Sequence, residues 1–243
     1  MDGFDEDFSS DPLRRGWYFD FDMLGIGRKR NPGDEAPVMS LDAVPYRWVK
    51  ETRSLHVAGA WPVAGGAKVA VSTHGQRQRL VHPIQPLDRR KDFQATLEFQ
   101  VESLGSPSAN PIILGFFNSE QPLQEQSLTL QIASPRLAEW IVAAGGKLQV
   151  HPLAVEGELV PGGSYRAVLR FDSTTGRFDA ALTVLTARSG TAASLAAMPL
   201  LTLPVGDGWR CDEFGIALGA DTGDGTSSGP IHQYRLTRLS LKR

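Results

Sequence analysis

Apolar and polar residues alternate with a period of two along several stretches of the chain. From Phe93 to Val101 the apolar side chains recur at alternate positions, and Gln, Thr and Glu fill the positions between them. A period of two places the apolar side chains on one face of an extended strand, whereas a helix needs a period near 3.6. The pattern therefore predicts a half-buried antiparallel strand nine residues long.

Two further stretches alternate in the same way and are close enough in the chain to pair. Apolar side chains recur from Tyr165 to Phe171 and again from Phe178 to Val184, with the polar run Asp172–Arg177 between them. A short connection that contains glycine, between two alternating stretches, predicts a β-hairpin. Ile112–Phe117 is instead continuously apolar, which is typical of a strand buried on both faces.

Shorter apolar stretches predict further strands at Leu55–Val57, Lys68–Ser72, Leu128–Ile132, Ala138–Ala143, Lys147–His151, Glu213–Leu218 and Gln233–Lys242. In the last of these, Tyr234 and Leu236 share one parity, whereas Leu239 and Leu241 share the other. The switch between Leu236 and Leu239 predicts either a β-bulge or a strand that changes face.

No stretch shows a sustained period of 3.6, so we predict little helix. A short helix could form within Thr191–Leu201, and the irregular segments are Gly25–Pro37, Gln76–Arg90 and Asp221–Pro230. Roughly a dozen short strands separated by turn signals indicate a β-sandwich or a barrel. No break in composition marks a linker, so we expect one domain over residues 1–243.

Composition and charge narrow the choice of function. The chain has 243 residues, 41% of them hydrophobic, and 25 basic against 27 acidic side chains give a net charge of −2. Proteins that bind the backbone of DNA or RNA normally carry a basic excess, so this balance argues against a nucleic-acid partner. No apolar run approaches the ~20 residues that span a bilayer, so we expect no membrane span.

The first residues are acidic and lack the apolar stretch of a signal peptide. We therefore expect a cytoplasmic protein, or an extracellular or periplasmic one whose leader has been removed. Cys211 is the only cysteine, which excludes a disulfide within the chain and a thiolate zinc site. We expect Cys211 to be a small, partly buried side chain, and the five histidines have no ligand spacing.

Four parts of the chain, taken in order, resemble one known superfamily. They are the opening Phe4–Trp17, with its acidic-Phe-Ser strand, Asp-Pro turn and Gly-Trp pair, then Phe93–Gly105 leading into Ile113–Ser119, the hairpin Tyr165–Leu185, and the closing Tyr234–Leu239. They are similar to the concanavalin A-like lectin/glucanase superfamily, which includes the laminin-G-like jelly rolls. The resemblance implies an all-β, two-sheet antiparallel jelly-roll β-sandwich with one concave sheet and with its first and last strands adjacent.

The resemblance implies several functions, because the superfamily contains lectins, carbohydrate-binding modules, glycoside hydrolases and structural domains. We predict a non-catalytic module of an exported or surface protein that binds a glycan or another ligand. The alternatives are a structural or interaction domain with a protein partner, and a glycoside hydrolase or lyase-like enzyme. The glucanase pattern Glu-x-Asp-x-x-Glu is absent. The most similar pair is Glu98 and Glu102, whose Cα atoms would lie roughly 13 Å apart along a strand.

Calcium-binding relatives take oxygen ligands from residues near the chain ends, and Asp5, Asp7 and Asp224 could supply some of them here. The superfamily commonly carries an acidic pair before its closing strand, where this chain has His232 and Gln233. We therefore expect no metal and no cofactor.

The predicted ligand face is the polar parity of Phe93–Glu102, on the concave sheet. Carboxylate, amide and hydroxyl groups offer donors and acceptors to sugar hydroxyls, arginine offers a planar fork, and tryptophan offers a face on which a sugar ring can stack. The predicted ligand-binding residues are Glu98, Gln100, Asn118, Trp140, Arg166 and Arg170.

Overall fold

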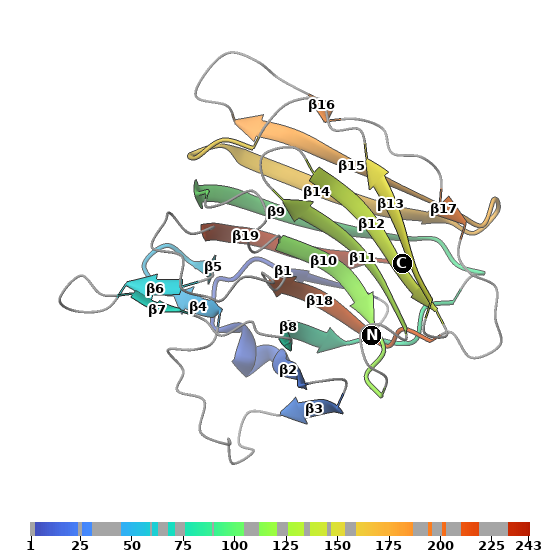
Figure 1. Cartoon of the computed structure of the whole chain (residues 1–243), viewed down its shortest axis with the longest axis horizontal. Helices are drawn as coiled ribbons and strands as arrows, with labels where there is room; N and C mark the ends of the chain where they lie inside the picture. Colours follow the sequence, from blue (N-terminus) through green and yellow to red (C-terminus); the bar gives the residue numbers. More distant parts are fainter. Residues whose placement is uncertain are drawn as a thin grey trace.

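Two large antiparallel sheets and a two-stranded ribbon make up the structure (Figure 1). The computed structural model describes residues 3–23, 26–30, 45–58, 60–62, 68–70, 76–88, 90–104, 112–120, 126–133, 137–144, 147–153, 159–186, 194–195, 201–202, 210–218 and 233–243. The ribbon pairs β6 (Ala60–Pro62) with β7 (Lys68–Ala70). Among all the residues that the structure describes, the one helical element is a 3-10 turn, η1 (Pro12–Arg15).

Sheet A has nine strands and contains both the first and the last strand. They are β1 (Phe4–Glu6), β4 (Tyr46–Val49), β5 (Ser54–Ala58), β9 (Phe93–Ser103), β14 (Ser164–Asp172), β15 (Arg177–Thr186), β16 (Ser194–Leu195), β17 (Leu201–Thr202) and β19 (Gln233–Lys242). The main path runs β16-β15-β14-β9-β19-β5-β4, while β1 pairs with β19 and β17 with β15.

Sheet B has eight strands, which come from all parts of the chain. They are β2 (Tyr18–Met23), β3 (Ile26–Arg30), β8 (Gln76–Pro83), β10 (Ile112–Phe117), β11 (Gln126–Ala133), β12 (Leu137–Ala144), β13 (Lys147–Leu153) and β18 (Glu213–Leu218). Their order is β13-β12-β11-β10-β18-β8-β2-β3, so β18 lies between two strands that are distant from it in sequence.

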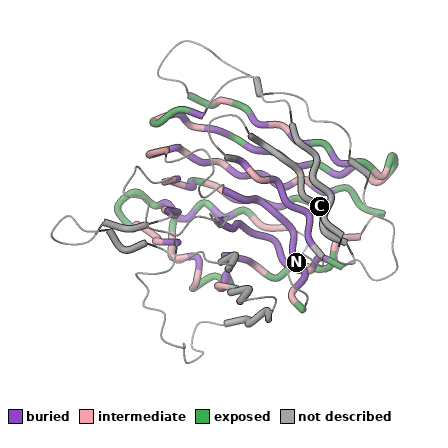
Figure 2. The backbone as a smooth tube through the Cα atoms, in the orientation of Figure 1, coloured by how far each residue is buried: buried purple, intermediate pink, exposed green. Residues whose placement is uncertain are grey.

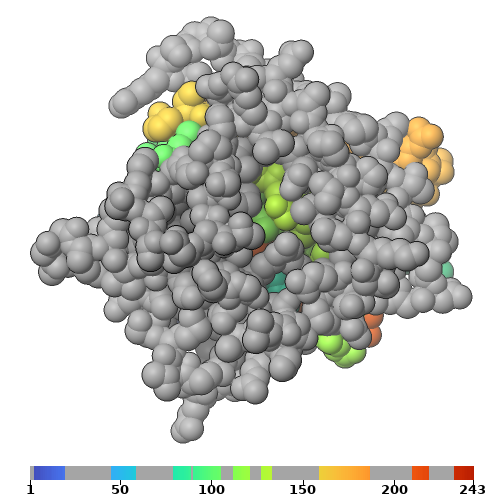
Figure 3. Space-filling view, viewed as in Figure 1, coloured from blue at the N-terminus to red at the C-terminus, as the bar shows by residue number. Residues whose placement is uncertain are grey.

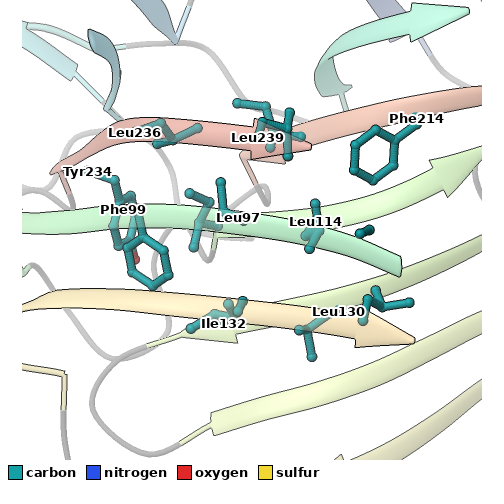
Figure 4. Close-up of a cluster of buried hydrophobic side chains, with 14 of the residues drawn as sticks. Leu97, Phe99, Leu114, Leu130, Ile132, Phe214, Tyr234, Leu236 and Leu239 are labelled. Atoms are coloured by element: carbon teal, nitrogen blue, oxygen red, sulfur yellow. The ribbon is translucent and has the colours of Figure 1, made fainter. Parts of the chain in front are cut away.

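The hydrophobic core lies between the inner faces of the two sheets. Figure 2 shows buried residues along the central strands of both. Figure 4 shows the side chains that meet there: Leu97, Phe99, Tyr234, Leu236 and Leu239 from sheet A, and Leu114, Leu130, Ile132 and Phe214 from sheet B. Full burial of each such side chain stabilises the fold by about 1.5–3 kcal/mol, so this contact holds the sheets together.

The predicted parity switch in the last strand is a β-bulge. Leu236 pairs with Phe99 and Arg238 pairs with Glu98, so the register shifts at the residue between them, Thr237. Thr237 is exposed, whereas Leu236 and the leucines that follow it are buried. The extra residue turns the second half of β19 over, and both halves therefore face the core.

The first strand covers part of one edge of the last strand, as the resemblance implies. Along one edge β19 pairs with β9, and along the other Gln233–Leu236 pairs with β5 and Leu239–Leu241 pairs with β1. Phe4 lies opposite Leu241 and packs against the core. The prediction that the chain ends meet in one sheet is confirmed.

A buried carboxylate fixes the segment that follows β1. Glu6 is 3% exposed and accepts hydrogen bonds from the backbone N–H of Phe8, at 2.7 Å, and from the indole Nε1 of Trp17, at 3.0 Å. It also forms an ion pair with Arg15, at the end of η1. Because a buried charge is tolerated only when its oxygens are bonded, these contacts tie β1, η1 and Trp17 into one unit.

The structure confirms most predicted strands, but some segments differ. Gln76–Pro83, predicted as irregular, is strand β8: its buried neighbours Leu80 and Val81 belong to different clusters on opposite faces, so no alternation is visible. Ile26–Arg30 is likewise a strand, and β2, β4 and β6 were not predicted. Ser194–Leu195 and Leu201–Thr202 are short strands, and the rest of the predicted helix and the segment Asp221–Pro230 lie outside the described residues.

Deletion of Thr237 tests the role of the bulge. Leu236 pairs with Phe99 and Arg238 with Glu98, so deletion of the exposed residue between them leaves a regular strand in which Leu239 and Leu241 still face the core. We therefore expect the free energy of unfolding to change by less than about 1 kcal/mol. Urea denaturation followed by tryptophan fluorescence measures this change. Thr237→Ala keeps the register and should change stability by less than about 1 kcal/mol. A loss of more than ~3 kcal/mol in the deletion variant would contradict the assignment, because it would mean that Leu239 and Leu241 had turned away from the core.

Candidate functional site

Four of the six predicted ligand residues lie on the outer face of sheet A. Glu98 and Gln100 belong to β9, and Arg166 and Arg170 belong to the neighbouring strand β14. The register places Arg166 opposite Glu98 and Arg170 opposite Gln94. The polar parities of the two strands therefore form one continuous surface.

The polar groups of this surface bind one another across the strands. Arg166 donates from Nε to Oε1 of Glu98 at 2.9 Å, and Arg170 donates from Nε to Oε1 of Gln94 at 3.0 Å. The Arg166 side chain is 45% exposed, whereas that of Glu98 is only 18% exposed. The arginines lie over their partners and keep the face solvated and close to neutral.

The same pattern continues onto β19. Arg235 donates to the side-chain oxygen of Gln100 and lies 3.7 Å from Glu102, measured from Nε to Oε1. Glu102 also lies 3.3 Å from Nδ1 of His56, on β5. Glu98 and Glu102 thus have separate partners, and no contact between the two carboxylates points to joint chemistry.

Of the other two predicted residues, one follows a strand of sheet B and one lies in that sheet. Asn118 follows β10 and fastens a turn: it donates from Nδ2 to the carbonyl oxygen of Arg210 at 2.7 Å and accepts from the backbone N–H of Glu120 at 2.7 Å. Trp140 is in β12, where the register places it opposite Leu130, and its side chain lies outside the described part of the chain. The two sheets therefore separate the six residues into different groups.

The centre of sheet B is buried on its outer face as well as on its inner face. Every residue of β10 and of β18 is buried, which confirms the prediction made for Ile112–Phe117. On the outer face a second, smaller apolar cluster forms, separate from the main core; it consists of Tyr18, Val81, Ile113, Phe117 and Ala217. An outer sheet face that is both apolar and buried is unlike the solvated face of sheet A.

Charged and polar side chains accompany this small cluster. Glu213 is 0% exposed and accepts a hydrogen bond from the hydroxyl of Tyr18. Arg79 is 1% exposed, and its guanidinium carbon lies 5.0 Å from the centroid of the Phe117 ring, a cation–π contact. Thr129 is also buried, as is Ser127, which the register places opposite Phe117. Apolar side chains with a few fixed polar groups are typical of ligand sites.

Two glycines form the middle of this outer face. Gly115 and Gly215 lie opposite each other on β10 and β18. A Cβ on Gly115 would come within 2.7 Å of Cγ2 of Thr129 and 3.1 Å of Cζ of Phe117, so the ring leans along β10 over the glycine. A Cβ on Gly215 would overlap the carbonyl oxygen of Leu80, so this glycine lets β18 approach β8 closely. Figure 3 shows atoms of β10 and β11, in green and yellow-green, near the middle of the view.

Sequence reasoning missed most of this arrangement. Glu213 opens a predicted strand and is not among the predicted ligand residues, and Arg79 lies in a segment predicted to be irregular. The available signal was a glycine inside each of two apolar strands, Gly115 and Gly215, because an isolated glycine in a strand indicates a close approach of another group.

Several further expectations concern metals, thiol chemistry and membranes. In the described ranges no group of three or more His, Cys, Asp or Glu side chains could hold a metal ion. Asp5 binds Arg238, which lowers the pKa of the aspartate, Asp7 binds the backbone N–H of Ser9, and Asp224 lies outside the described residues.

Cys211 is fully rather than partly buried, and burial raises the pKa of its thiol, so little thiolate forms. Among the residues that the structure describes, no helix is long and apolar enough to cross a bilayer.

Comparison with solved structures shows the fold of the chain. The chain is similar to lectin I-B4 from Griffonia simplicifolia, with a TM-score of 0.56 and 8% identity over 99% of this chain and 98% of that one. Basic winged bean lectin gives a TM-score of 0.56 and 10% identity, over 99% and 98%. A xylan β-1,4-xylosidase from Bacillus halodurans gives 0.57 and 10%, over 98% of this chain and 39% of the enzyme.

These structures are concanavalin A-like jelly rolls, and the chain has that fold. The prediction of a two-sheet antiparallel jelly roll is confirmed. A scan against models of known protein families finds no match, and a search of curated protein sequences finds none.

Gly215→Ala tests the close approach of β8 and β18. The added methyl group would meet backbone rather than a movable side chain, so we expect a loss of about 3 kcal/mol in the free energy of unfolding. Gly176→Ala is the control, because Gly176 has a φ of 67° but nothing within 4 Å of the added Cβ, and it should lose about 1 kcal/mol. Chemical denaturation compares the two variants. A smaller loss for Gly215→Ala than for Gly176→Ala would contradict the packing described.

The ion pair between Arg166 and Glu98 gives a second test. Both side chains reach solvent, so a double-mutant cycle with Arg166→Ala and Glu98→Ala should give a coupling free energy of about 0.2–1 kcal/mol that shrinks with added salt. A coupling well above this range, or one insensitive to salt, would show that the outer face of sheet A is less solvated than its exposure indicates.

Proposed function

We propose that the chain is a carbohydrate-binding β-sandwich whose ligand site is the outer face of sheet B. One combination on this face carries the proposal: Tyr18 donates a hydrogen bond to Glu213, and close to this pair the Phe117 ring lies over Gly115. Sugars are recognised through hydroxyls that need fixed donors and acceptors, and through C–H faces that pack on apolar or aromatic side chains. This face offers both within a few residues, on rigid strands.

The structural neighbours support a glycan as the ligand. Winged bean lectin was solved with the Tn-antigen, and lectin I of Ulex europaeus with a methyl glycoside of α-L-fucose; the latter has a TM-score of 0.53 and 9% identity to this chain. The fold is therefore one on which sugar binding occurs. Because the identities are so low, the location of the site is argued from this chain's own residues.

The outer face of sheet A, which carries Glu98, Gln100, Arg166 and Arg170, is the competing site. Its groups are suited to hydroxyls, but they already bind one another across β9, β14 and β19. The described strands of that face carry no buried aromatic side chain on their outer parity, so a sugar ring would have no aromatic surface there on which to pack. We therefore place the site on sheet B.

Glycan binding by matched variants tests both faces. An array of soluble and immobilised glycans identifies a ligand for the wild type, and calorimetry then measures its affinity. We expect Glu213→Gln and Thr129→Val, both close in shape to the native residues, to weaken binding at least tenfold, which corresponds to about 1.4 kcal/mol. Glu98→Ala and Arg166→Ala are the matched variants of sheet A and should bind within about twofold of the wild type, because both residues lie on the sheet that does not form the proposed site. Near-ultraviolet circular dichroism checks that each variant is folded.

The outcomes separate the alternatives. Loss of binding in the sheet A variants alone would move the site to the face predicted from the sequence. Loss in Trp140→Ala alone would point to the β12 side of sheet B. Absence of any glycan ligand for the wild type would overturn the proposal and favour a structural or interaction domain, while turnover of a bound polysaccharide would favour the enzyme.

A further inference from the structure

His82 lies where the N-terminal segment meets the two sheets. It is on β8, opposite Phe214 of β18. Its ring centroid is 5.0 Å from that of Phe4, on β1, and 5.5 Å from that of Trp17, which follows η1. Nδ1 lies 2.8 Å from the carbonyl oxygen of Pro83. An imidazole thus fills the space between the first strand and sheet B.

The glycine before Trp17 shows how closely this ring is held. Gly16 has a φ of 89°, and a Cβ there would come within 3.3 Å of Nε2 of His82. The ring therefore has backbone on one side and aromatic rings on others. Burial in this setting disfavours the imidazolium, because a charged ring would lose hydration.

The charged groups on the surrounding elements have partners of their own. On the N-terminal segment Glu6 binds Arg15, and Asp5 binds Arg238. At the start of β18, Asp212 binds Ser119, while Glu213 binds Tyr18 on the outer face. On β8 itself, Arg79 lies against Phe117. Desolvation is therefore the main influence on the pKa of His82.

We propose that His82 is an acid-sensitive latch for the N-terminal segment, so that its protonation releases β1 from the edge of β19. The released segment consists of β1, η1 and Trp17, which Glu6 ties together. The freed edge is Leu239–Leu241, the part of β19 that β1 covers. An uncovered strand edge exposes backbone N–H and C=O groups that can pair with another chain.

The direction of the pH effect follows from the environment of the ring. Burial lowers the pKa of His82, and hydrogen bonds to the carbonyls of Pro83 and Arg15 oppose this in part. With the latch open, the pKa returns to about 6.5. The closed state therefore binds fewer protons: its full stability is present above about pH 6.5 and is lost as the pH falls through the lower pKa of the closed state. Asp5 stays ionised in this range, because Arg238 lowers its pKa from 3.8.

Hydrogen exchange followed by mass spectrometry tests the latch on the intact chain. At about pH 7.5 and about pH 5, on either side of the ordinary histidine pKa, exchange rates are corrected for the intrinsic effect of pH. We expect protection of residues 4–6 and 239–241 to fall at least tenfold at the lower pH, while the central amides of β9 and β10 keep theirs. His82→Phe, which fills the same space with a ring that does not titrate, should remove the pH dependence.

Two further variants keep the test decisive. His82→Gln, which is polar and does not titrate, should also remove the pH dependence even if it lowers protection at both pH values. His56→Gln, on the outer face of sheet A, should behave as the wild type. A pH-dependent loss that persists in both His82 variants, or unchanged protection of residues 4–6 in the wild type, would overturn the proposal. Equal loss in every strand would do so too, because it would show global unfolding.

Discussion

Contact between the apolar inner faces of sheets A and B is the interaction on which the rest of the structure depends. Strands from both ends of the chain and from its middle contribute to it, and only burial against the opposite sheet removes their leucine and phenylalanine side chains from water. The bulge at Thr237 shows how strictly this constraint acts. The last strand accepts a break in its hydrogen-bond register so that Tyr234, Leu236, Leu239 and Leu241 all reach the same core.

The outer faces of the two sheets differ in their exposure to water. On sheet A, carboxylate and amide groups of β9 receive arginines from β14 and β19, and the result is a solvated surface of modest energetic value. On sheet B, the central strands β10 and β18 are buried on both sides, and the outer side holds charged groups as well as apolar ones. Keeping Glu213 and Arg79 away from water is unfavourable unless contacts compensate for it. We interpret the burial of two charged side chains on one sheet face as support for the proposed ligand site.

The N-terminal segment shows how one short stretch connects several parts of the fold. Glu6 binds the Phe8 backbone and the Trp17 indole, while the Trp48 indole donates to the carbonyl oxygen of Phe8 at 2.8 Å. Through these bonds the segment is attached to β4 and β19 of sheet A, and through the aromatic contacts of His82 it is attached to sheet B. A titratable ring at such a junction can couple the protonation of one side chain to the pairing of a strand.

The sequence by itself determined the fold class, many of the strands and the change of parity in the last strand, because a period of two is a local property and its parity is visible without any partner. It also indicated that β10 is buried on both faces, since a run without polar residues leaves no side for water. Only the tertiary structure decided which polar residues meet. Glu98 and Arg166, both predicted as ligand residues, are paired across neighbouring strands, whereas Trp140 lies in the other sheet and Asn118 follows one of its strands. Glu213, Tyr18 and Arg79 are not among the predicted ligand residues. Strand order in a jelly roll joins segments far apart in the chain, as with Tyr18 and Glu213, and local alternation carries no information about which strands become neighbours.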